Sequence, residues 1–156
     1  MITIYTDGAS KGNPGPGGFG IVLISGKHRK EISGGYRKTT NNRMELLAVI
    51  AGLETLKKDG MNVRVYSDSK YVVDAIEKGW VHNWLKKGFK GKKNEDLWRR
   101  FLRVYPKHKV KFKWVKGHAG ISENERCDEL AVQAAEGPQF LVDKGFEGAQ
   151  SASLFS

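Results

Sequence analysis

Short stretches in which β-branched or other apolar residues alternate with polar ones predict the strands of this chain. They cover residues 1–6, 19–25, 31–37, 62–66 and 110–114. The first three follow one another closely, with a turn at Gly26-Lys27, and therefore predict an antiparallel meander. The first and fourth strands are expected to stop at Asp7-Gly8 and at Asp68. Two strands thus end on an acid.

Helical spacing of apolar residues predicts helices over residues 44–56, 69–78, 94–104 and 122–136. Ser122 is expected to cap the last helix, with Glu125 closing a capping box. Residues 80–93 are basic and follow no clear period. Hairpins give antiparallel neighbours and helical crossovers give parallel ones, so the order of elements predicts an α/β fold with a five-stranded sheet of mixed direction and flanking helices.

The chain has 156 residues, which suits one domain, and 27 Lys+Arg against 17 Asp+Glu give a net charge of +10. An excess of this size favours a polyanionic partner such as nucleic acid, with solubility as the alternative. We see no signal peptide and no apolar run long enough for a membrane span. The single cysteine, Cys127, has no partner for a disulfide or a zinc site. A cytoplasmic protein is expected.

Three acids stand out by position. Asp7 and Asp68 follow strands, where ligands of open α/β sheets bind, and Glu45 is the only charge between Met44 and Leu53. Each has a structural alternative: Asp7 as part of a turn, Asp68 as a helix cap, and Glu45 as a capping-box partner of Asn42. If the three converge, two carboxylates about 4 Å apart repel by roughly 4 kcal/mol at an effective dielectric near 20. Mg²⁺, a hard cation that takes oxygen ligands, would relieve that repulsion.

In the last helix, Glu123, Glu125, Asp128 and Glu129 are equal candidates from composition alone. A resemblance separates them. In order, the chain carries Tyr5-Thr6-Asp7-Gly8-Ala9, Asn41-Asn42-Arg43-Met44-Glu45-Leu46, Tyr66-Ser67-Asp68-Ser69, Trp114-Val115-Lys116-Gly117-His118-Ala119-Gly120 and Asn124-Glu125-Arg126-Cys127-Asp128-Glu129-Leu130-Ala131. This series resembles the bacterial type 1 ribonuclease H family over about residues 1–136.

The resemblance implies the ribonuclease H-like fold and a catalytic quartet of Asp7, Glu45, Asp68 and Asp128. It implies endonucleolytic cleavage of the RNA strand of RNA/DNA hybrids with two Mg²⁺ ions, Mn²⁺ being a possible substitute, to leave 3′-hydroxyl and 5′-phosphate ends. His118, in a glycine-flanked loop, is expected to shuttle a proton or assist product release. Residues 1–137 would form the catalytic domain, and residues 138–156 a flexible tail.

Lysines cluster between Lys78 and Lys93, where no acid occurs and aromatic residues are interleaved. Lysines bind phosphates and aromatic rings pack on sugars or bases, so this segment is expected to hold the hybrid, as the family's basic protrusion does. The alternative is a solvated lysine face over core aromatics, which we expect for Trp98 and Trp114. The predicted substrate-binding residues are Asn13, Thr40, Asn41, Asn42, Trp80, Trp84, Lys86, Lys87 and Lys90.

Two competing functions remain open from the sequence. One is a hybrid- or DNA-binding module without chemistry, and the other is a different nuclease of the same superfamily that also uses clustered acids and Mg²⁺. The four acids argue against the first, and the His118 loop with the lysine segment argues against the second. A monomer is expected.

Overall fold

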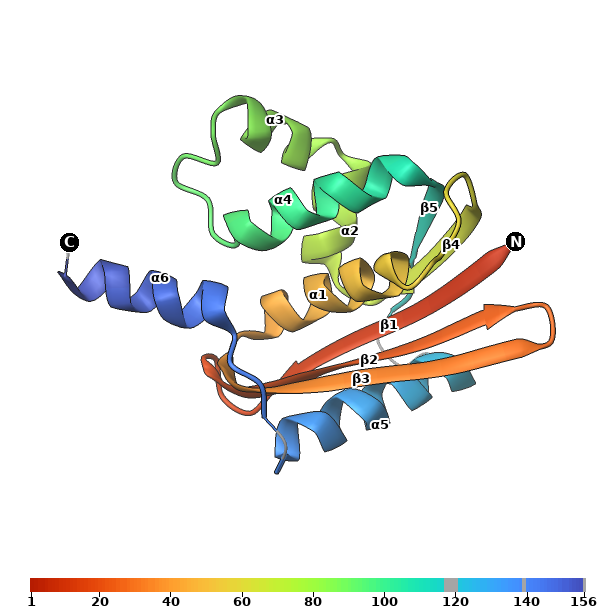
Figure 1. Cartoon of the computed structure of the whole chain (residues 1–156), viewed down its shortest axis with the longest axis horizontal. Helices are drawn as coiled ribbons and strands as arrows, with labels where there is room; N and C mark the ends of the chain where they lie inside the picture. Colours follow the sequence, from red (N-terminus) through yellow and green to blue (C-terminus); the bar gives the residue numbers. More distant parts are fainter. Residues whose placement is uncertain (117–120, 139, 156) are drawn as a thin grey trace.

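The computed structural model describes residues 1–116, 121–138 and 140–155, and its centre is one five-stranded sheet in the order β3-β2-β1-β4-β5 (Figure 1). The strands are β1 (Ile2–Ser10), β2 (Gly15–Ser25), β3 (His28–Thr39), β4 (Asn62–Ser67) and β5 (Lys109–Trp114). β1, β2 and β3 pair antiparallel, whereas β4 pairs parallel with both β1 and β5. The predicted five-stranded mixed sheet is confirmed.

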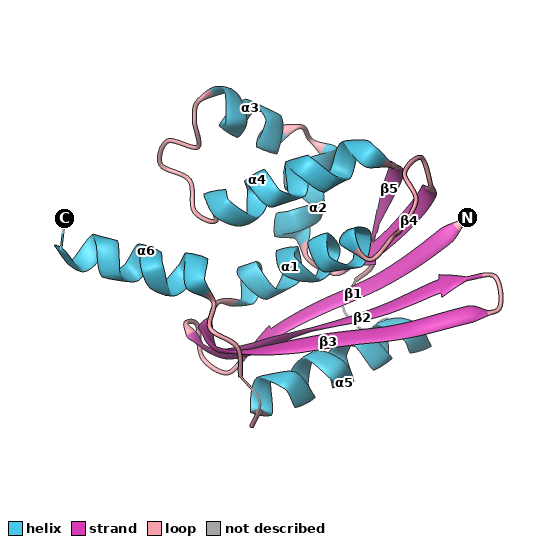
Figure 2. Ribbon diagram, viewed as in Figure 1, coloured by secondary structure: helices cyan, strands magenta, loops and turns pink. Residues whose placement is uncertain are grey.

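Helices cover both faces of the sheet (Figure 2). They are α1 (Asn41–Glu54), α2 (Lys70–Glu77), α3 (Trp80–Lys86), α4 (Glu95–Val104), α5 (Ser122–Glu136) and α6 (Lys144–Phe155), with a 3-10 turn at Tyr105–Lys107. α1 lies between β1 and α4 and belongs to the main apolar core, and α5 packs on the opposite face against β1, β2 and β3. Among the described residues, no helix is both long and apolar enough to traverse a membrane.

The contact between α5 and the sheet depends on the absence of a side chain at Gly20. A Cβ atom there would lie 2.2 Å from the carbonyl oxygen of Cys127. α5 therefore rests directly on the backbone of β2, at the position that pairs with Asp7. On the same face, Cys127 donates from Sγ to the carbonyl of Tyr5 over 3.2 Å. These two contacts fix the first half of α5 beside the middle of β1.

The end of β1 and the N-terminal caps of α1 and α5 differ from what the sequence predicted. β1 continues to Ser10, so Asp7 lies inside a strand. Thr40 caps α1 by accepting from the backbone N–H of Arg43, which excludes the box between Asn42 and Glu45. α5 has no side-chain cap: Ile121 holds the cap position, and the Ser122 hydroxyl donates to Glu123.

The segment read as irregular after Lys78 contains the seven-residue helix α3, which follows Gly79 at φ +73°. Trp98 is fully buried, as expected. Trp114 is 39% exposed, so its expected place in the core is wrong. Phe89, an aromatic residue between Lys78 and Lys93, is buried. Its ring therefore belongs to the core, where it packs under Arg99.

The chain after residue 137 is not irregular, because it pairs with β3 and then forms α6. The N–H of Leu141 donates to the carbonyl of Gly35, and the N–H of Arg37 donates back to Leu141. Farther along, Glu147 makes a two-pronged ion pair with Arg37, with both N–O distances 2.9 Å. Part of the segment that was expected to be a flexible tail thus has regular structure. That residues 138–156 move as a tail stays a prediction.

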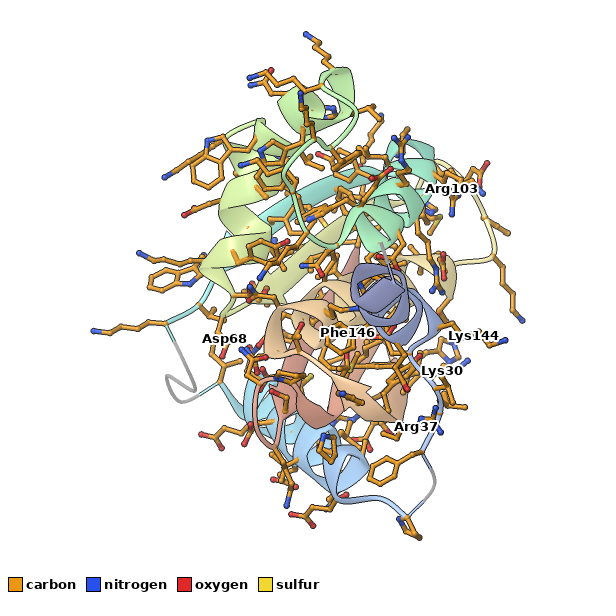
Figure 3. All side chains as sticks on the ribbon, turned by 90° about the vertical axis from the view of Figure 1, so that its left-hand side faces the viewer. Lys30, Arg37, Asp68, Arg103, Lys144 and Phe146 are labelled. Carbon is orange, nitrogen blue, oxygen red and sulfur yellow. The ribbon has the colours of Figure 1, made fainter. Side chains whose placement is uncertain are left out.

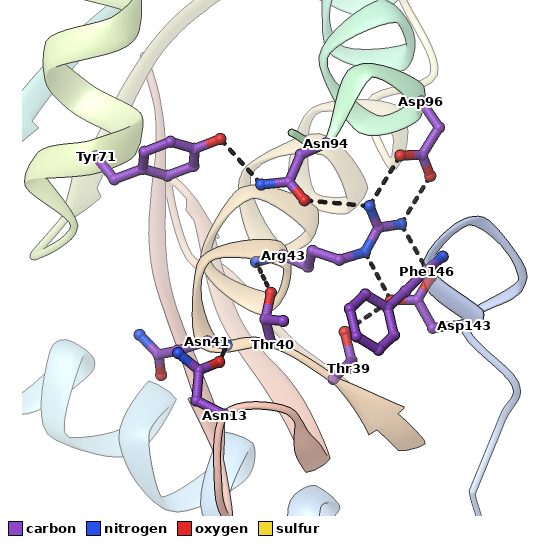
Figure 4. Close-up of polar contacts among 10 residues, drawn as sticks. All are labelled: Asn13, Thr39, Thr40, Asn41, Arg43, Tyr71, Asn94, Asp96, Asp143 and Phe146. Carbon is purple, nitrogen blue, oxygen red and sulfur yellow. Dashed lines mark hydrogen bonds and ion pairs between the residues drawn. The ribbon is translucent and has the colours of Figure 1, made fainter. Parts of the chain in front are cut away.

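A buried guanidinium connects this segment to two helices (Figure 4). Arg43 of α1, 3% exposed, donates to both carboxylate oxygens of Asp143 and to both of Asp96 on α4. Asp143 also accepts from the Thr39 hydroxyl at the end of β3 and from the N–H of Phe146 in α6. A buried charge is tolerable only when it is paired and hydrogen-bonded, and here one cation satisfies two acids.

We predict that Asp143→Ala lowers the free energy of unfolding by about 3 kcal/mol, because it leaves part of the Arg43 charge buried without its partner. Glu147→Ala removes an acid from the same segment but breaks only the exposed pair with Arg37, and it is the matched control. Urea unfolding of both variants measures the difference. Equal stabilities would show that the buried network does not hold this segment.

Candidate active site at the centre of the sheet

Asp7 and Glu45 meet because β1 and α1 approach each other at Gly8. A Cβ atom on Gly8 would lie 2.4 Å from the backbone nitrogen of Glu45, so a larger residue would push the helix away. Both acids are nearly inaccessible, with exposed fractions of 4% for Asp7 and 5% for Glu45. The Gly8 N–H donates to Asp7 Oδ1 over 2.8 Å and orients that carboxylate.

Asp68, labelled in Figure 3, follows the end of β4, which runs parallel to β1. Its carboxylate lies close to those of Asp7 and Glu45. Asp68 is not the cap of α2, since Ser69 takes that role by accepting from the N–H of Val72. The Asp68 carbonyl accepts from the indole N–H of Trp114 over 3.1 Å, which ties the turn to the end of β5. The side chain of Asp68 is half-buried.

These three acids form a group whose potential ligand oxygens, one from each residue, lie within 4.8 Å of one another. Burial, followed by the charge of Asp68, raises the pKa of Asp7 to about 7. Burial, followed by the charge of Asp7, raises the pKa of Glu45 well above its usual value. Within the described part of the chain, Glu45 Oε2 is buried without a hydrogen-bond partner. An oxygen-rich, mutually repelling donor set with an unsatisfied oxygen fits a hard divalent cation.

Asp128 lies on α5, one residue after Cys127, and is half-buried. It is outside the group of three, yet its charge is among the causes that raise the pKa of Asp7. The other candidate acids of this helix are engaged elsewhere or exposed. Glu129 pairs with Arg126, Glu123 accepts from Ser122, and Glu125 faces solvent. Among the candidate acids of α5, Asp128 is thus the one whose charge acts on the pKa of Asp7.

His118 lies outside the described residues, so its predicted role stays a prediction.

Three of the predicted polar substrate residues, Asn13, Thr40 and Asn41, lie together at the start of α1 (Figure 4), and Asn42 follows them in the helix. Asn13 accepts from the backbone N–H of Asn41 over 3.1 Å, which joins the glycine-rich turn to the helix. The side chains of Asn41 and Asn42 are exposed, while the Thr40 hydroxyl is used as the helix cap. Asn13, Thr40 and Asn42 also line a cavity of about 850 Å³ that reaches Lys92 and Phe146.

The basic segment forms a separate projection built on α3 (Figure 1). Lys86, Lys87 and Lys90 are all exposed. Trp80 is 42% exposed, with Lys78 Nζ 5.2 Å from the ring centre. Trp84 is half-buried: its ring stands edge-on to Trp98 at 5.9 Å, with Lys92 Nζ 5.2 Å from its centre. Trp80 is therefore exposed on the surface of the projection, and Trp84 mainly supports it.

The sheet has the order β3-β2-β1-β4-β5, and two buried acids and one half-buried acid meet where β1, β4 and α1 come together. The chain is therefore an α/β protein with a candidate metal site formed by carboxylates. A family model described as RNase H matches residues 1–136, and the chain belongs to the RNase H family.

Relatives and solved structures agree with this membership. The chain is 59% identical to a ribonuclease H of Desulforamulus reducens over 147 residues, covering 91% of this chain and 92% of the relative. It is 54% identical to a ribonuclease H of Trichodesmium erythraeum, covering 94% and 96%.

Two solved structures are also similar. LC9-RNase H1, a type 1 RNase H with the type 2 active-site motif, has a TM-score of 0.78 at 34% identity over 94% of this chain and 79% of that chain. LC11-RNase H1, solved in complex with an RNA/DNA hybrid, has a TM-score of 0.60 at 27% identity, covering 87% and 97%.

We predict that Asp7→Asn raises the melting temperature of the metal-free protein at pH 8. The folded-state pKa of Asp7, about 7, lies above its unfolded value, so this residue's contribution to stability is present at pH 4 and is lost as pH rises through 7. Asparagine keeps the acceptor for Gly8 and removes the charge. A rise of roughly 3–6 °C corresponds to about 1–2 kcal/mol for a chain of this size.

Thermal melts in EDTA at pH 8 and pH 4 check this expectation, and the two proteins should converge at pH 4. Added Mg²⁺ should stabilise the parent protein more than the variant, because the variant has lost one anionic ligand. Identical melting at pH 8 in EDTA would mean that the three acids do not repel.

Proposed function

We propose that this chain is an endonuclease that hydrolyses the RNA strand of RNA/DNA hybrids and leaves 3′-hydroxyl and 5′-phosphate ends. The observation that carries the proposal is the group formed by buried Asp7, buried Glu45 and half-buried Asp68 in a chain of the RNase H family. A similar protein, LC11-RNase H1, has been solved in complex with an RNA/DNA hybrid, which supports the choice of substrate.

Mg²⁺ is the proposed ion, with two ions present when substrate is bound and Mn²⁺ as a possible replacement. Asp7, Glu45, Asp68 and Asp128 would hold them. Bound ions of this kind lower the pKa of a water and neutralise the charge that develops on a phosphoryl group. The protein's part is to fix the ligands in advance. Gly8 brings Glu45 against β1 and orients Asp7, and the turn after β4 is held by Trp114.

His118 is proposed to move a proton near the scissile phosphate or to assist product release. This role is based on the family resemblance and on the suitability of imidazole, whose unperturbed pKa in general is about 6.5, for proton transfer. The 2′-hydroxyl would be recognised and would not act as the nucleophile. Selection of RNA on one strand requires such contacts on that strand alone.

The hybrid would be held at two places. Asn13, Thr40, Asn41 and Asn42 would meet one backbone at the start of α1, where N–H groups and amide side chains suit phosphates. Lys86, Lys87 and Lys90, together with Trp80 and Trp84, would meet the other strand. We propose a cytoplasmic monomer, in keeping with a single cysteine that is buried. Residues 1–137 would be the catalytic unit.

Asp7→Asn is predicted to abolish cleavage in Mg²⁺ while leaving hybrid binding largely intact. A labelled RNA/DNA hybrid, duplex RNA and duplex DNA, each with Mg²⁺ and with EDTA, form the assay. Cutting confined to the RNA of the hybrid, lost in EDTA and in the variant, is the expected result. Binding without cutting by the parent protein would favour a non-catalytic module. Cutting of duplex DNA would favour another nuclease of the superfamily. Near-normal turnover by Asp7→Asn would remove this acid from the mechanism.

The triple variant Lys86→Ala/Lys87→Ala/Lys90→Ala is predicted to bind the hybrid more weakly, with a logarithmic salt dependence lower in slope by about 2, since each phosphate contact contributes roughly 0.7–0.9. All three side chains are exposed, so the fold should be unaffected. Binding measured over a range of KCl concentrations gives the slope. An unchanged slope would remove the projection from the hybrid-binding surface.

A further inference from the structure

A second basic surface lies on the sheet itself, away from α3. α5 packs against β1, β2 and β3, whereas the outward-facing residues of β4 and β5 on the same side are exposed. Four of them are cations: Arg64 on β4 and Lys109, Lys111 and Lys113 on β5. We call these four residues the outer strip.

The pairing of the strands places these cations side by side. Arg64 is in register with Lys111, and Tyr66 with Lys113. Alternate residues of a strand are about 7 Å apart and neighbouring strands about 4.8 Å apart, so the outer strip is about 13 Å long and two strands wide. In the described part of the chain, none of its four cations makes an ion pair. Its charge is therefore available to a partner.

The outer strip leads to the acids. Tyr5 and Tyr66 stack on one another beside it, with ring centres 4.9 Å apart, and each is followed two residues later in sequence by an acid of the site, Asp7 or Asp68. Glu123 of α5 borders the tyrosine pair, where its charge contributes to the raised pKa of Tyr5 after burial. Cations and aromatic rings thus continue from the cluster of acids along one face of the sheet.

We propose that the outer strip binds a single-stranded nucleic-acid segment that continues from the hybrid held at the acids. The narrow row of cations matches one phosphate backbone, and the adjoining aromatic rings offer faces and edges to unstacked bases, a combination typical of single-strand binding. The proposal rests on the proposed function only in taking the hybrid as the anchor. Its consequence is preferential binding of hybrids that carry a single-stranded extension.

The test compares binding of a short blunt RNA/DNA hybrid, the same hybrid with an oligo-dT tail of about 10 nucleotides at either end of the DNA, and a blunt hybrid lengthened by the same number of base pairs. Asp7→Asn serves as the non-cleaving background. In it, the triple variant Arg64→Ala/Lys111→Ala/Lys113→Ala is compared with Lys27→Ala/Lys30→Ala/Lys58→Ala, which removes three exposed cations elsewhere. Fluorescence anisotropy over a range of KCl concentrations gives each Kd.

We expect one of the tails to tighten binding, and the strip variant to lose that gain together with about 2 units of salt slope, since single strands contribute roughly 0.7 per phosphate. The control variant should keep both. The proposal is overturned if neither tail tightens binding, if both variants lose the gain equally, or if the lengthened duplex gains as much as the tailed hybrid.

Cleavage of the blunt hybrid by protein with Asp7 intact tests the proposed function separately. Both triple variants should retain that cleavage, because the proposal assigns the outer strip to the single-stranded extension, which the blunt hybrid lacks. Failure of the parent protein to cleave would overturn the proposed function and leave the binding comparison interpretable.

Discussion

Repulsion among buried carboxylates is the constraint on which the rest of this structure depends. Asp7 and Glu45 are almost inaccessible, and their pKa values are raised by burial and by neighbouring acids. If the backbone moved apart at this point, the two carboxylates would separate and become hydrated, which is favourable for them. The rest of the fold must therefore prevent that movement. It does so with backbone contacts, which do not yield as a flexible side chain would. Gly8 lies against the backbone of α1, and Gly20 lies against the backbone of α5. The close backbone contacts of β1 and β2 with the two helices therefore keep the acids in place.

Electrostatic features of opposite sign are arranged around this centre. Acids converge where β1 and β4 meet α1, while cations occupy the α3 projection and the far part of the β4–β5 face. Such cations attract a polyanion, whereas the acids repel it unless divalent ions are bound between them and the polyanion. The net charge of +10 does not reveal this arrangement, because it is the sum over a negatively charged centre and a positively charged surface around it.

Helices and strands with a clear hydrophobic period could be predicted from the sequence. Elements that are stabilised mainly by contacts with distant residues could not. α5 agrees with its predicted bounds, and Glu45 was located by its isolation in an apolar helix that is indeed buried. α3 has only seven residues and no side-chain cap, and α6 is anchored through Asp143 and Glu147 to residues about 100 positions earlier, so neither leaves a strong local signal. The continuation of β1 beyond Asp7 was missed because Asp-Gly usually signals a turn. Asp128 was separated from its neighbours only by resemblance.

The pairing of Leu141 with the outer side of β3 has a consequence for how copies of this chain behave towards one another. β3 is the last strand on its side of the sheet, and an unprotected last strand is a template for another molecule's backbone. Gly35 and Arg37 direct their backbone groups to Leu141, so part of that template is already occupied by the chain's own C-terminal residues. The segment thus acts as a built-in guard against self-association. Removal of this segment would cause aggregation first in crowded or concentrated solutions.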